Sequence, residues 1–336
     1  MSVPLKVGVA GVGSLGFHHA RILRGIPDVQ VVGIHDTNPE RLAYVSGELG
    51  LSAFEHAGDL FDAVDACVIA VPTNAHEAVA IEALRRGLHV LVEKPIAPTL
   101  EAADRMLLAA EEGGAVIQIG HVERFNGVLR ACEPYLDEPM FVESHRLAPF
   151  GPRGTDVAVV LDLMIHDLDL VLTLMKRPVT SVGAVGVPVL TSNPDIANAR
   201  LEFEGGGVAN LTASRVSLER MRKIRFFQKS GYISLDLAGG TGAFLRLKPG
   251  VSWEARLAIA NGEQPIDAAS LFNYVENISL KGNGAEPLRA ELESFVAAAL
   301  GREPVAVTGR EARDALAVAL DITARIDRYV SDRQAR

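Results

Sequence analysis

Ten residues near the N-terminus constrain the fold of this chain more than any other feature. The segment Val7–Gly16 is an apolar strand that runs into a glycine-rich turn, and its glycines follow the spacing G-x-G-x-x-G. In this spacing the first glycine permits a tight turn, the second lets the backbone approach a pyrophosphate, and the third lets the next helix contact the strand. That helix is predicted over Phe17–Leu23, with free N–H groups at its start. The predicted cofactor contacts here are Gly11, Gly13, Ser14, Leu15 and Gly16.

Asp36 stands where a nucleotide-binding carboxylate is expected. It follows a second apolar strand, Val29–Ile34, and lies twenty residues beyond Gly16. A carboxylate at this place takes the ribose hydroxyl of NAD and repels the additional phosphate of NADP. Arg41 could still turn towards such a phosphate. The sequence favours NAD over NADP, and the alternative is that Asp36 only caps the helix predicted over Pro39–Leu49.

Strands and helices alternate through the first third of the chain, which is typical of a doubly wound parallel sheet. A chain of 336 residues also exceeds the size of roughly 250 residues at which single cores stop growing. We therefore predict an α/β nucleotide-binding domain over residues 1–121 and a second domain over residues 122–336. The predicted strands of the first domain are Leu5–Ala10, Val29–Ile34, Ala66–Val71, Val90–Val92 and Val116–Ile119.

The second domain is predicted to be α+β, because a helix near Phe125–Tyr135 is followed by a run of extended segments. Several of them alternate apolar and polar residues, as an antiparallel sheet with one open face would. Two helices, Pro287–Leu300 and Arg310–Val330, close the chain, and the last can pack back on the first domain. The extended segments are Met140–Leu147, Val179–Pro188, Asn198–Glu204, Val208–Ser214, Ile224–Lys229, Tyr232–Asp236 and Ala243–Leu247.

Composition narrows the classes of partner. The net charge of −9 argues against nucleic acid, which requires a basic surface. No run of eighteen apolar residues is present, and the N-terminus passes into a strand without a signal-peptide pattern, so we expect no membrane partner and a cytoplasmic protein. Cys67 and Cys132 stand alone and are expected to be small apolar residues in a reducing compartment. No metal is expected, because the histidines and acids lack ligand spacing.

Lys94 is the first catalytic candidate. It belongs to the tripeptide Glu93-Lys94-Pro95, which stands where the apolar run Gly87–Val92 stops. In open α/β sheets ligands lie outside the carboxyl ends of the strands, so a strand that ends in an ionisable side chain points it towards the ligand. The alternative is a surface lysine on a loop.

A second group of ionisable residues lies in the segment Asp156–Leu172, which is predicted to be a helix that is apolar almost all round. Asp162, His166 and Asp169 occupy positions i, i+4 and i+7, which places them along one face. Asp162 and His166 have the composition of a general base with its orienting carboxylate. The alternative is an ordinary ion pair on a solvated face.

These motifs together resemble the glucose–fructose oxidoreductase / inositol dehydrogenase (Gfo/Idh/MocA) family over nearly the whole chain. The resemblance implies an N-terminal Rossmann domain, a second domain on a large open mixed sheet, and a nicotinamide cofactor between them. It also implies a cis bond before Pro95. The family often has Thr-Pro-Asn where this chain has Pro72-Thr73-Asn74. The cofactor contacts that it adds are Pro72, Thr73, Asn74, His76, Glu93, Lys94 and Pro95.

The resemblance further implies a catalytic set of Lys94, Asp162 and His166 and the oxidation of a secondary alcohol. His166 would take the hydroxyl proton while the carbon-bound hydrogen leaves as hydride to the nicotinamide. Lys94 would favour the developing alkoxide by placing a fixed positive charge beside it.

Substrate choice is expected to depend on two segments, Gly120–Asn126 and Ser144–Gly154, which are predicted to border the cofactor crevice. Their arginines could bind a diphosphate through charge-assisted hydrogen bonds. These segments are similar to family members that oxidise the 3-hydroxyl of UDP-N-acetylglucosamine-type sugars. The candidate substrate contacts are Lys94, His121, Arg124, Asn126, Arg146, Arg153 and His166.

Three alternatives remain open at this stage. The chain could be a dehydrogenase of a free polyol such as inositol or of a monosaccharide, a glycosidase that keeps NAD bound, or a non-catalytic NAD-sensing protein. Retention of Lys94, Asp162 and His166 argues against the last. A homodimer or homotetramer is expected, because an incompletely covered face of the second domain's sheet usually marks a contact surface.

Overall fold

The computed structural model describes residues 3–151, 157–263 and 270–334. The chain divides into two compact units, and its C-terminal part contributes to both of them. The first unit contains residues 1–125 and 285–321, and the second contains residues 126–284 and 322–336. We describe each unit by itself.

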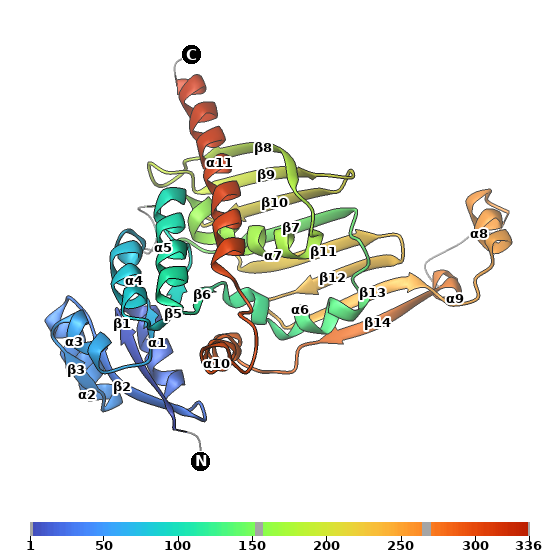
Figure 1. Cartoon of the computed structure of the whole chain (residues 1–336). Coiled ribbons are helices and arrows are strands. Elements are labelled where there is room, and N and C mark those ends of the chain that lie inside the picture. Colours follow the sequence, from blue (N-terminus) through green and yellow to red (C-terminus); the bar gives the residue numbers. More distant parts are fainter. Residues whose placement is uncertain (1–2, 152–156, 264–269, 335–336) are drawn as a thin grey trace. The chain divides into compact units, whose positions relative to one another are not determined.

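The first unit is built on a six-stranded parallel sheet with the order β3-β2-β1-β4-β5-β6 (Figure 1). This order is that of the Rossmann fold, so the predicted fold of this part is confirmed. The strands are β1 (Leu5–Ala10), β2 (Val29–His35), β3 (Ser52–Phe54), β4 (Ala66–Ile69), β5 (His89–Glu93) and β6 (Ile117–Gly120). The helices are α1 (Ser14–Leu23), α2 (Pro39–Leu49), α3 (Ala57–Asp62), α4 (His76–Arg85), α5 (Leu100–Gly113), α10 (Pro287–Ala299) and the first part of α11 (Gly309–Gln334).

The core of the first unit includes residues that are far apart in the sequence. Val7 and Val9 of β1 and Leu23 of α1 are wholly buried, as an apolar strand covered on both faces requires. Leu292 and Phe295 of α10 join the same cluster and are also wholly buried. Because buried apolar surface contributes about 25 cal/mol per Å², the packing of α10 against this cluster stabilises the first unit.

The second unit is built on an eight-stranded sheet with the order β14-β13-β12-β11-β7-β10-β9-β8. Strands β7 and β10 pair in parallel and all other neighbours are antiparallel, so the predicted mixed, mostly antiparallel sheet is confirmed. The strands are β7 (Phe141–Leu147), β8 (Val179–Val187), β9 (Ile196–Phe203), β10 (Val208–Ser214), β11 (Met221–Gln228), β12 (Gly231–Asp236), β13 (Thr241–Leu247) and β14 (Val275–Lys281).

One face of this sheet packs against α6 (Gly127–Cys132) and α7 (Ile165–Met175), and no helix among the described residues of the unit covers the other face (Figure 1). Alternate residues such as Val142 and Phe226 are therefore wholly buried under the helices. On the opposite face, one row of side chains that runs across neighbouring strands is apolar and half-buried. The ring centroids of Phe141 and Phe227 lie 5.1 Å apart, and those of Phe227 and Tyr232 lie 5.0 Å apart. The row consists of Val208, Phe141, Phe227, Tyr232 and Leu245.

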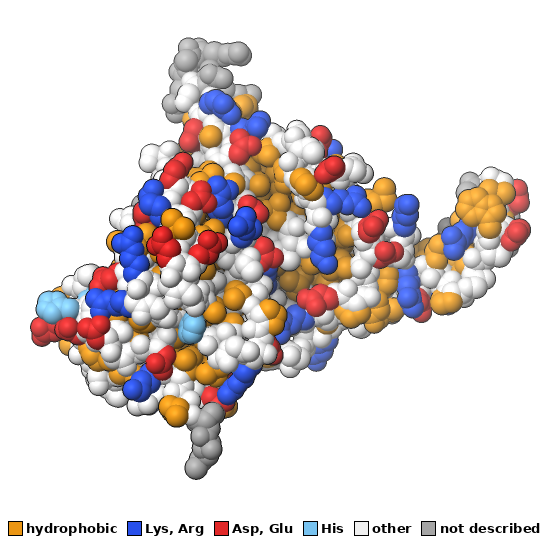
Figure 2. Space-filling model, in the orientation of Figure 1, with side chains coloured by type: hydrophobic (Ala, Val, Ile, Leu, Met, Phe, Trp, Pro, Cys, Tyr) orange, Lys and Arg blue, Asp and Glu red, His pale blue; other side chains and the backbone are white. Residues whose placement is uncertain are grey.

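A helical excursion leaves the sheet between β13 and β14. It carries the short helices α8 (Trp253–Ala260) and α9 (Leu271–Tyr274), which lie beyond the ends of the strands in Figure 1. Figure 2 shows hydrophobic side chains on its surface, and Trp253 is 68% exposed. No helix among the described residues is long and apolar enough to span a membrane.

Candidate functional site

The glycine turn after β1 has the geometry that dinucleotide binding requires. Gly11 has φ +84°, and a Cβ there would lie 2.7 Å from the backbone of Ala70, so no other residue fits without strain. A Cβ at Gly16 would lie 1.8 Å from the carbonyl oxygen of Gly11. A Cβ at Gly13 would meet nothing within 4 Å. Gly13 thus leaves an open approach beside the N-terminus of α1, which suits a pyrophosphate.

Ser14 and Leu15 begin α1 at this opening. Leu15 is 50% exposed although it is a large apolar residue in a helix. Of the predicted glycine-loop contacts, Gly13 and Leu15 are exposed, Ser14 is half-buried, and Gly11 and Gly16 are buried. The turn therefore offers backbone and one apolar side chain to a ligand, while the two buried glycines shape it.

Asp36 and Arg41 hold the other side of the same turn. The backbone N–H of Val12 donates to Oδ2 of Asp36 at 2.7 Å, and that of Asn38 donates to Oδ1 at 2.9 Å. Each carboxylate oxygen keeps a further lone pair for a ribose hydroxyl. The cap of α2 is Asn38, whose Oδ1 accepts from the N–H groups of Glu40 and Arg41, each at 3.0 Å. Helix capping therefore does not account for Asp36.

The guanidinium of Arg41 has partners within the unit. Its Nε donates to the carbonyl of Val12 at 2.7 Å, and its Nη2 donates to the carbonyl of Gly13 at 3.0 Å. The same group lies over the rings of Phe17 and Tyr44, at 5.7 and 5.3 Å from their centroids. Arg41 is thus part of the support of the glycine turn.

His76 joins the two loops that follow β4 and β5. Its Nδ1 lies 3.0 Å from the carbonyl oxygen of Pro95, and its Nε2 lies 3.0 Å from that of Val71. Burial lowers the pKa of His76, against the opposing effect of these carbonyl groups and of Glu93. The ring is 1% exposed, so its role in this structure is to hold the loops. Asn74 is exposed and Thr73 is half-buried in the short helix Thr73–Ala75 that precedes α4, and Pro72, directly before this helix, is exposed.

Lys94 follows directly on the last residue of β5, and its peptide bond to Pro95 is cis, as the resemblance implied. Lys94 is half-buried, whereas Glu93 and Pro95 are buried. Glu93 faces His19 of α1, with 2.6 Å between Oε1 and Nε2. Glu93 was predicted to contact the cofactor, and His19 was not predicted.

In the second unit the helix that carries Asp162 and His166 begins with a π-helical turn, Val160–Met164, and continues as α7. Such turns are rare and frequently occur at functional sites. Asp162 and His166 are half-buried, whereas Asp169 is 1% exposed. Of the three polar residues predicted along one face, Asp169 is therefore buried. Asp162 and His166, which were predicted to act together, are the two that remain accessible.

Several candidate substrate contacts have structural partners. The guanidinium of Arg146 is buried and forms a bidentate pair with Asp167, at 3.0 and 2.8 Å. Arg124 pairs with Glu311 at 3.2 Å. Asn126 is 6% exposed, caps α6 by accepting from the N–H of Val128, and donates to the carbonyl of Leu237 at 2.9 Å. His121 is 1% exposed, and Arg153 lies outside the described residues.

A second buried ion pair supports the start of the helix that carries Asp162 and His166. Nε of Arg215 donates to Oδ1 of Asp195 at 3.0 Å, and its Nη2 donates to the carbonyl of Val157 at 2.6 Å. The N–H of Val159 donates to the carbonyl of Pro194 at 3.1 Å. Neither Asp195 nor Arg215 was predicted, because the two lie 20 positions apart and each stands among polar residues in the sequence.

Metal and thiol chemistry find no support among the described residues. No group of three or more histidine, cysteine, aspartate or glutamate side chains within them is placed to hold a metal ion. Cys67 and Cys132 are free and buried, and burial raises the pKa of each thiol to about 12. Neither is a thiolate at neutral pH.

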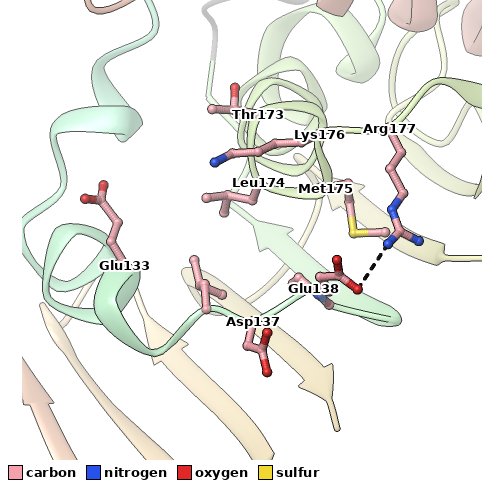
Figure 3. A pocket seen from close by; sticks show the side chains of 10 residues that line it. Glu133, Asp137, Glu138, Thr173, Leu174, Met175, Lys176 and Arg177 are labelled. Carbon is pink, nitrogen blue, oxygen red and sulfur yellow. Dashed lines mark ion pairs between the residues drawn. The ribbon is translucent and has the colours of Figure 1, made fainter. Parts of the chain in front are cut away.

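The second unit also has a pocket of about 610 Å³ between the segment that leads into β7 and the C-terminal end of α7 (Figure 3). Its charged residues have both signs, and Arg177 pairs with Glu138 at 3.4 Å. None of the predicted site residues lines it. We therefore locate the candidate site by the residues of the sequence motifs and do not assign it to this pocket.

Two family models match the chain. The model of an oxidoreductase family with an NAD-binding Rossmann fold, GFO_IDH_MocA, matches residues 5–121. The model of the GFO/IDH/MocA C-terminal domain matches residues 105–234.

Individual relatives agree with this assignment. UDP-N-acetylglucosamine 3-dehydrogenase of Acidithiobacillus ferrooxidans is 36% identical and covers 98% of this chain and 99% of its own length. Its solved structure superposes with a TM-score of 0.88 at 35% identity, covering 98% of this chain and 99% of that one. Myo-inositol 2-dehydrogenase of Thermotoga maritima is 24% identical over 93% of each chain. The WlbA dehydrogenase from Bordetella pertussis, solved with NADH and UDP-GlcNAcA, shares the fold, with a TM-score of 0.80 at 21% identity over 98% of this chain and 96% of its own.

Proposed function

Since the chain belongs to the GFO/IDH/MocA oxidoreductase family, we propose that it is an NAD-dependent dehydrogenase of a nucleotide sugar. The reaction would oxidise the 3-hydroxyl of a UDP-N-acetylglucosamine-type substrate. The observation that carries this proposal is the similarity to a UDP-N-acetylglucosamine 3-dehydrogenase over almost the full length of both chains. The predicted diphosphate contacts of the arginines give the proposal less support, because Arg124 and Arg146 have carboxylate partners.

The residues of the first unit fit a nicotinamide dinucleotide. The open approach at Gly13 and the N–H groups at the start of α1 suit its pyrophosphate, and Asp36 suits a ribose hydroxyl. The proposed contacts also include Leu15, Thr73, Glu93 and Lys94. When bound, the cofactor supplies an acceptor for hydride.

NAD is the form that Asp36 and Arg41 favour. The carboxylate of Asp36 would repel a phosphate on the ribose, and the guanidinium of Arg41 is already bonded to the carbonyls of Val12 and Gly13. We expect Asp36→Ser to reduce the ratio of kcat/KM for NAD to that for NADP by about tenfold or more, which corresponds to about 1.4 kcal/mol. An unchanged ratio in steady-state assays would show that Asp36 does not select the cofactor.

The proposed chemistry uses Lys94, Asp162 and His166. His166 accepts the proton of the substrate hydroxyl, and Asp162 orients its imidazole and favours the imidazolium that forms. Lys94 donates a hydrogen bond to the same oxygen and stabilises the alkoxide that develops as hydride leaves the carbon. Each group thus acts on the transfer of one proton and one hydride from a single CH–OH group.

A substrate panel tests the proposal. Purified protein with NAD should form NADH when UDP-N-acetylglucosamine is added, and it should be much less active with N-acetylglucosamine or myo-inositol. Activity confined to free polyols would assign the chain to the inositol-type branch. Cleavage of a glycoside with no net NADH would indicate a glycosidase, and NAD binding without turnover would indicate a sensing protein. Each of these three results would contradict the nucleotide-sugar proposal.

We also propose that the protein is a homo-oligomer and works in the cytoplasm, where NAD is supplied. Support for association comes from the apolar row on the open face of the sheet in the second unit, defined above by Phe141, Phe227 and their neighbours. The exposed side chains Trp253, Leu257 and Phe272 of the α8–α9 excursion add further apolar surface. Contiguous apolar surface of this kind marks a contact region. Sedimentation at micromolar concentration should give a dimer or a tetramer, and a monomer would contradict the proposal.

A further inference from the structure

The chain around Lys94 reaches the surface at this one residue. Residues 90–93 and 95–97 are buried, whereas Lys94 between them is half-buried. The pairing of β5 with β6 ends at Glu93, so Lys94 is the first residue beyond the paired part of the strand. A misplacement of about 1 Å at a reacting centre can cost about 10²-fold in rate. The contacts that hold the backbone on each side of Lys94 therefore matter for the proposed reaction.

A buried histidine of α1 holds the side that precedes Lys94. His19 is wholly buried, and its Nε2 lies 2.6 Å from Oε1 of Glu93, across 74 positions of sequence. A buried carboxylate is costly unless it is hydrogen-bonded, and this contact supplies one of its bonds. The other oxygen, Oε2, accepts from the backbone N–H of Lys94 at 3.3 Å. Glu93 thus links α1 to the backbone of Lys94.

The neighbouring strand leaves space for this carboxylate. Gly120 of β6 is paired with Glu93, and a Cβ at Gly120 would lie 3.1 Å from Oε2. This separation is shorter than an ordinary van der Waals contact, so a side chain at position 120 would displace the carboxylate. The place of Glu93 is therefore defined by His19 on one side and by a glycine on the other.

A second buried histidine, from α4, holds the side that follows Lys94. Nδ1 of His76 lies 3.0 Å from the carbonyl oxygen of Pro95 and 3.3 Å from that of Ile96. Its Nε2 lies 3.0 Å from the carbonyl oxygen of Val71. His76 thus ties the residues after Lys94 to the loop that follows β4.

We propose that His19 and His76 are positioning residues for Lys94. This inference rests on the proposed function, in which Lys94 hydrogen-bonds the substrate oxygen. The helix α1 begins at the proposed pyrophosphate site, and the loop after β4 carries the proposed cofactor contact Thr73. The two histidines therefore fix the backbone of Lys94 relative to two segments that are proposed to bind the cofactor. In this role they act through Lys94 and touch no reacting atom.

The variants His19→Leu and His76→Leu test the inference in the whole protein. Each removes the polar contacts and keeps a side chain in the buried position. We expect each to slow NADH formation from UDP-N-acetylglucosamine in a single turnover by about tenfold or more. An unchanged rate in either variant would overturn the inference for that residue. The matched control is His18→Leu, because His18 is the exposed neighbour of His19 on α1 and the substitution should leave the rate unaltered.

The same substitutions in Lys94→Ala separate positioning from general damage to the fold. If the histidines act through Lys94, either leucine variant should slow the Lys94→Ala protein by no more than about twofold. A role in the fold alone would give the same fractional loss with and without Lys94. Equal losses in the two backgrounds would overturn the inference.

Hydrogen exchange of the Lys94 amide, measured by NMR, tests the link through Glu93 without turnover. The exchange rate should rise by about tenfold or more in His19→Leu and stay unaltered in His18→Leu. Gly120→Ala covers the case in which His19→Leu does not fold, because it displaces the Glu93 carboxylate without removing a polar group, and it should raise the rate in the same direction. An unaltered exchange rate would contradict the inference. If exchange responds but no substrate yields NADH, the proposed function fails and the anchoring of Lys94 stands.

Discussion

The two units hold their candidate catalytic groups by different means. In the first, a buried histidine contacts main-chain carbonyls of the loop after Lys94 and of the loop after β4, and backbone N–H groups of the glycine turn and of Asn38 donate to Asp36. In the second, the helix with Asp162 and His166 is held by two buried ion pairs, Arg146 with Asp167 and Arg215 with Asp195. The comparison shows that a glycine turn can be built largely from local backbone geometry, whereas a helix placed on a sheet is held by side chains from distant strands.

The greatest effect is expected when one of these ion pairs is broken. Asp167→Ala leaves the guanidinium of Arg146 buried without its counter-charge, and removal of one partner from a buried pair costs about 3–5 kcal/mol. Urea unfolding should show that loss. In the first unit, Arg289 and Glu293 form an exposed pair one helical turn apart, so Glu293→Gln should cost only about 0.5 kcal/mol or less. Equal costs for the two variants would show that burial does not make the Arg146–Asp167 pair more important for stability than an exposed pair.

The second ion pair should be visible in the pH dependence of stability. Burial alone would raise the pKa of Asp195, but N–H groups of Thr191, Leu190 and Val189 donate to it and lower its pKa well below the ordinary value. A lowered pKa stabilises the fold above the unfolded value of about 3.9, and that stability is lost as the pH falls below it. The wild-type free energy of unfolding should therefore fall as the pH is lowered through this range. In Asp195→Asn that fall should be smaller by about 2 kcal/mol. An acid slope equal to that of the exposed variant Glu48→Gln would contradict this assignment.

A smaller effect is expected at the glycine turn. An added Cβ at position 13 meets nothing in the protein, so Gly13→Ala should keep the free energy of unfolding within about 0.5 kcal/mol. The same methyl group would stand where the pyrophosphate approaches, and we expect the Kd for NADH to rise about tenfold. Gly16→Ala is the contrasting variant, because its Cβ would overlap the carbonyl of Gly11 and should destabilise the turn itself. If NADH binds Gly13→Ala as tightly as it binds the unchanged protein, the turn does not approach the cofactor closely.

The same contrast explains what could be predicted from the sequence. The glycine turn and the position of Lys94 at a strand end were readable because each depends on neighbouring residues. His19 was missed because its partner lies 74 residues away, and Arg146 was interpreted as a substrate contact because the sequence does not show that Asp167 faces it across 21 residues. Burial of both members of such pairs depends on packing between elements, which no local pattern reports.

Short elements were missed for a related reason. The strand β3 has only three residues, too few for an alternating pattern, and in β14 the adjacent polar residues Glu276 and Asn277 interrupt the alternation. The π-helical turn Val160–Met164 was also not predicted, because its sequence reads as ordinary apolar helix. Elements that depend on tertiary pairing or on an unusual turn cannot be predicted from hydrophobic periodicity alone.

The most direct test of the account is a double-mutant cycle on Lys94 and His166, measured as the rate of NADH formation in a single turnover with UDP-N-acetylglucosamine. Lys94→Ala and His166→Ala should each slow this step by about two orders of magnitude or more. Because both groups serve one CH–OH group, the double variant should lose little more than either single variant. Losses that multiply, as they do for independent positions, or near-normal rates in the single variants would contradict the account.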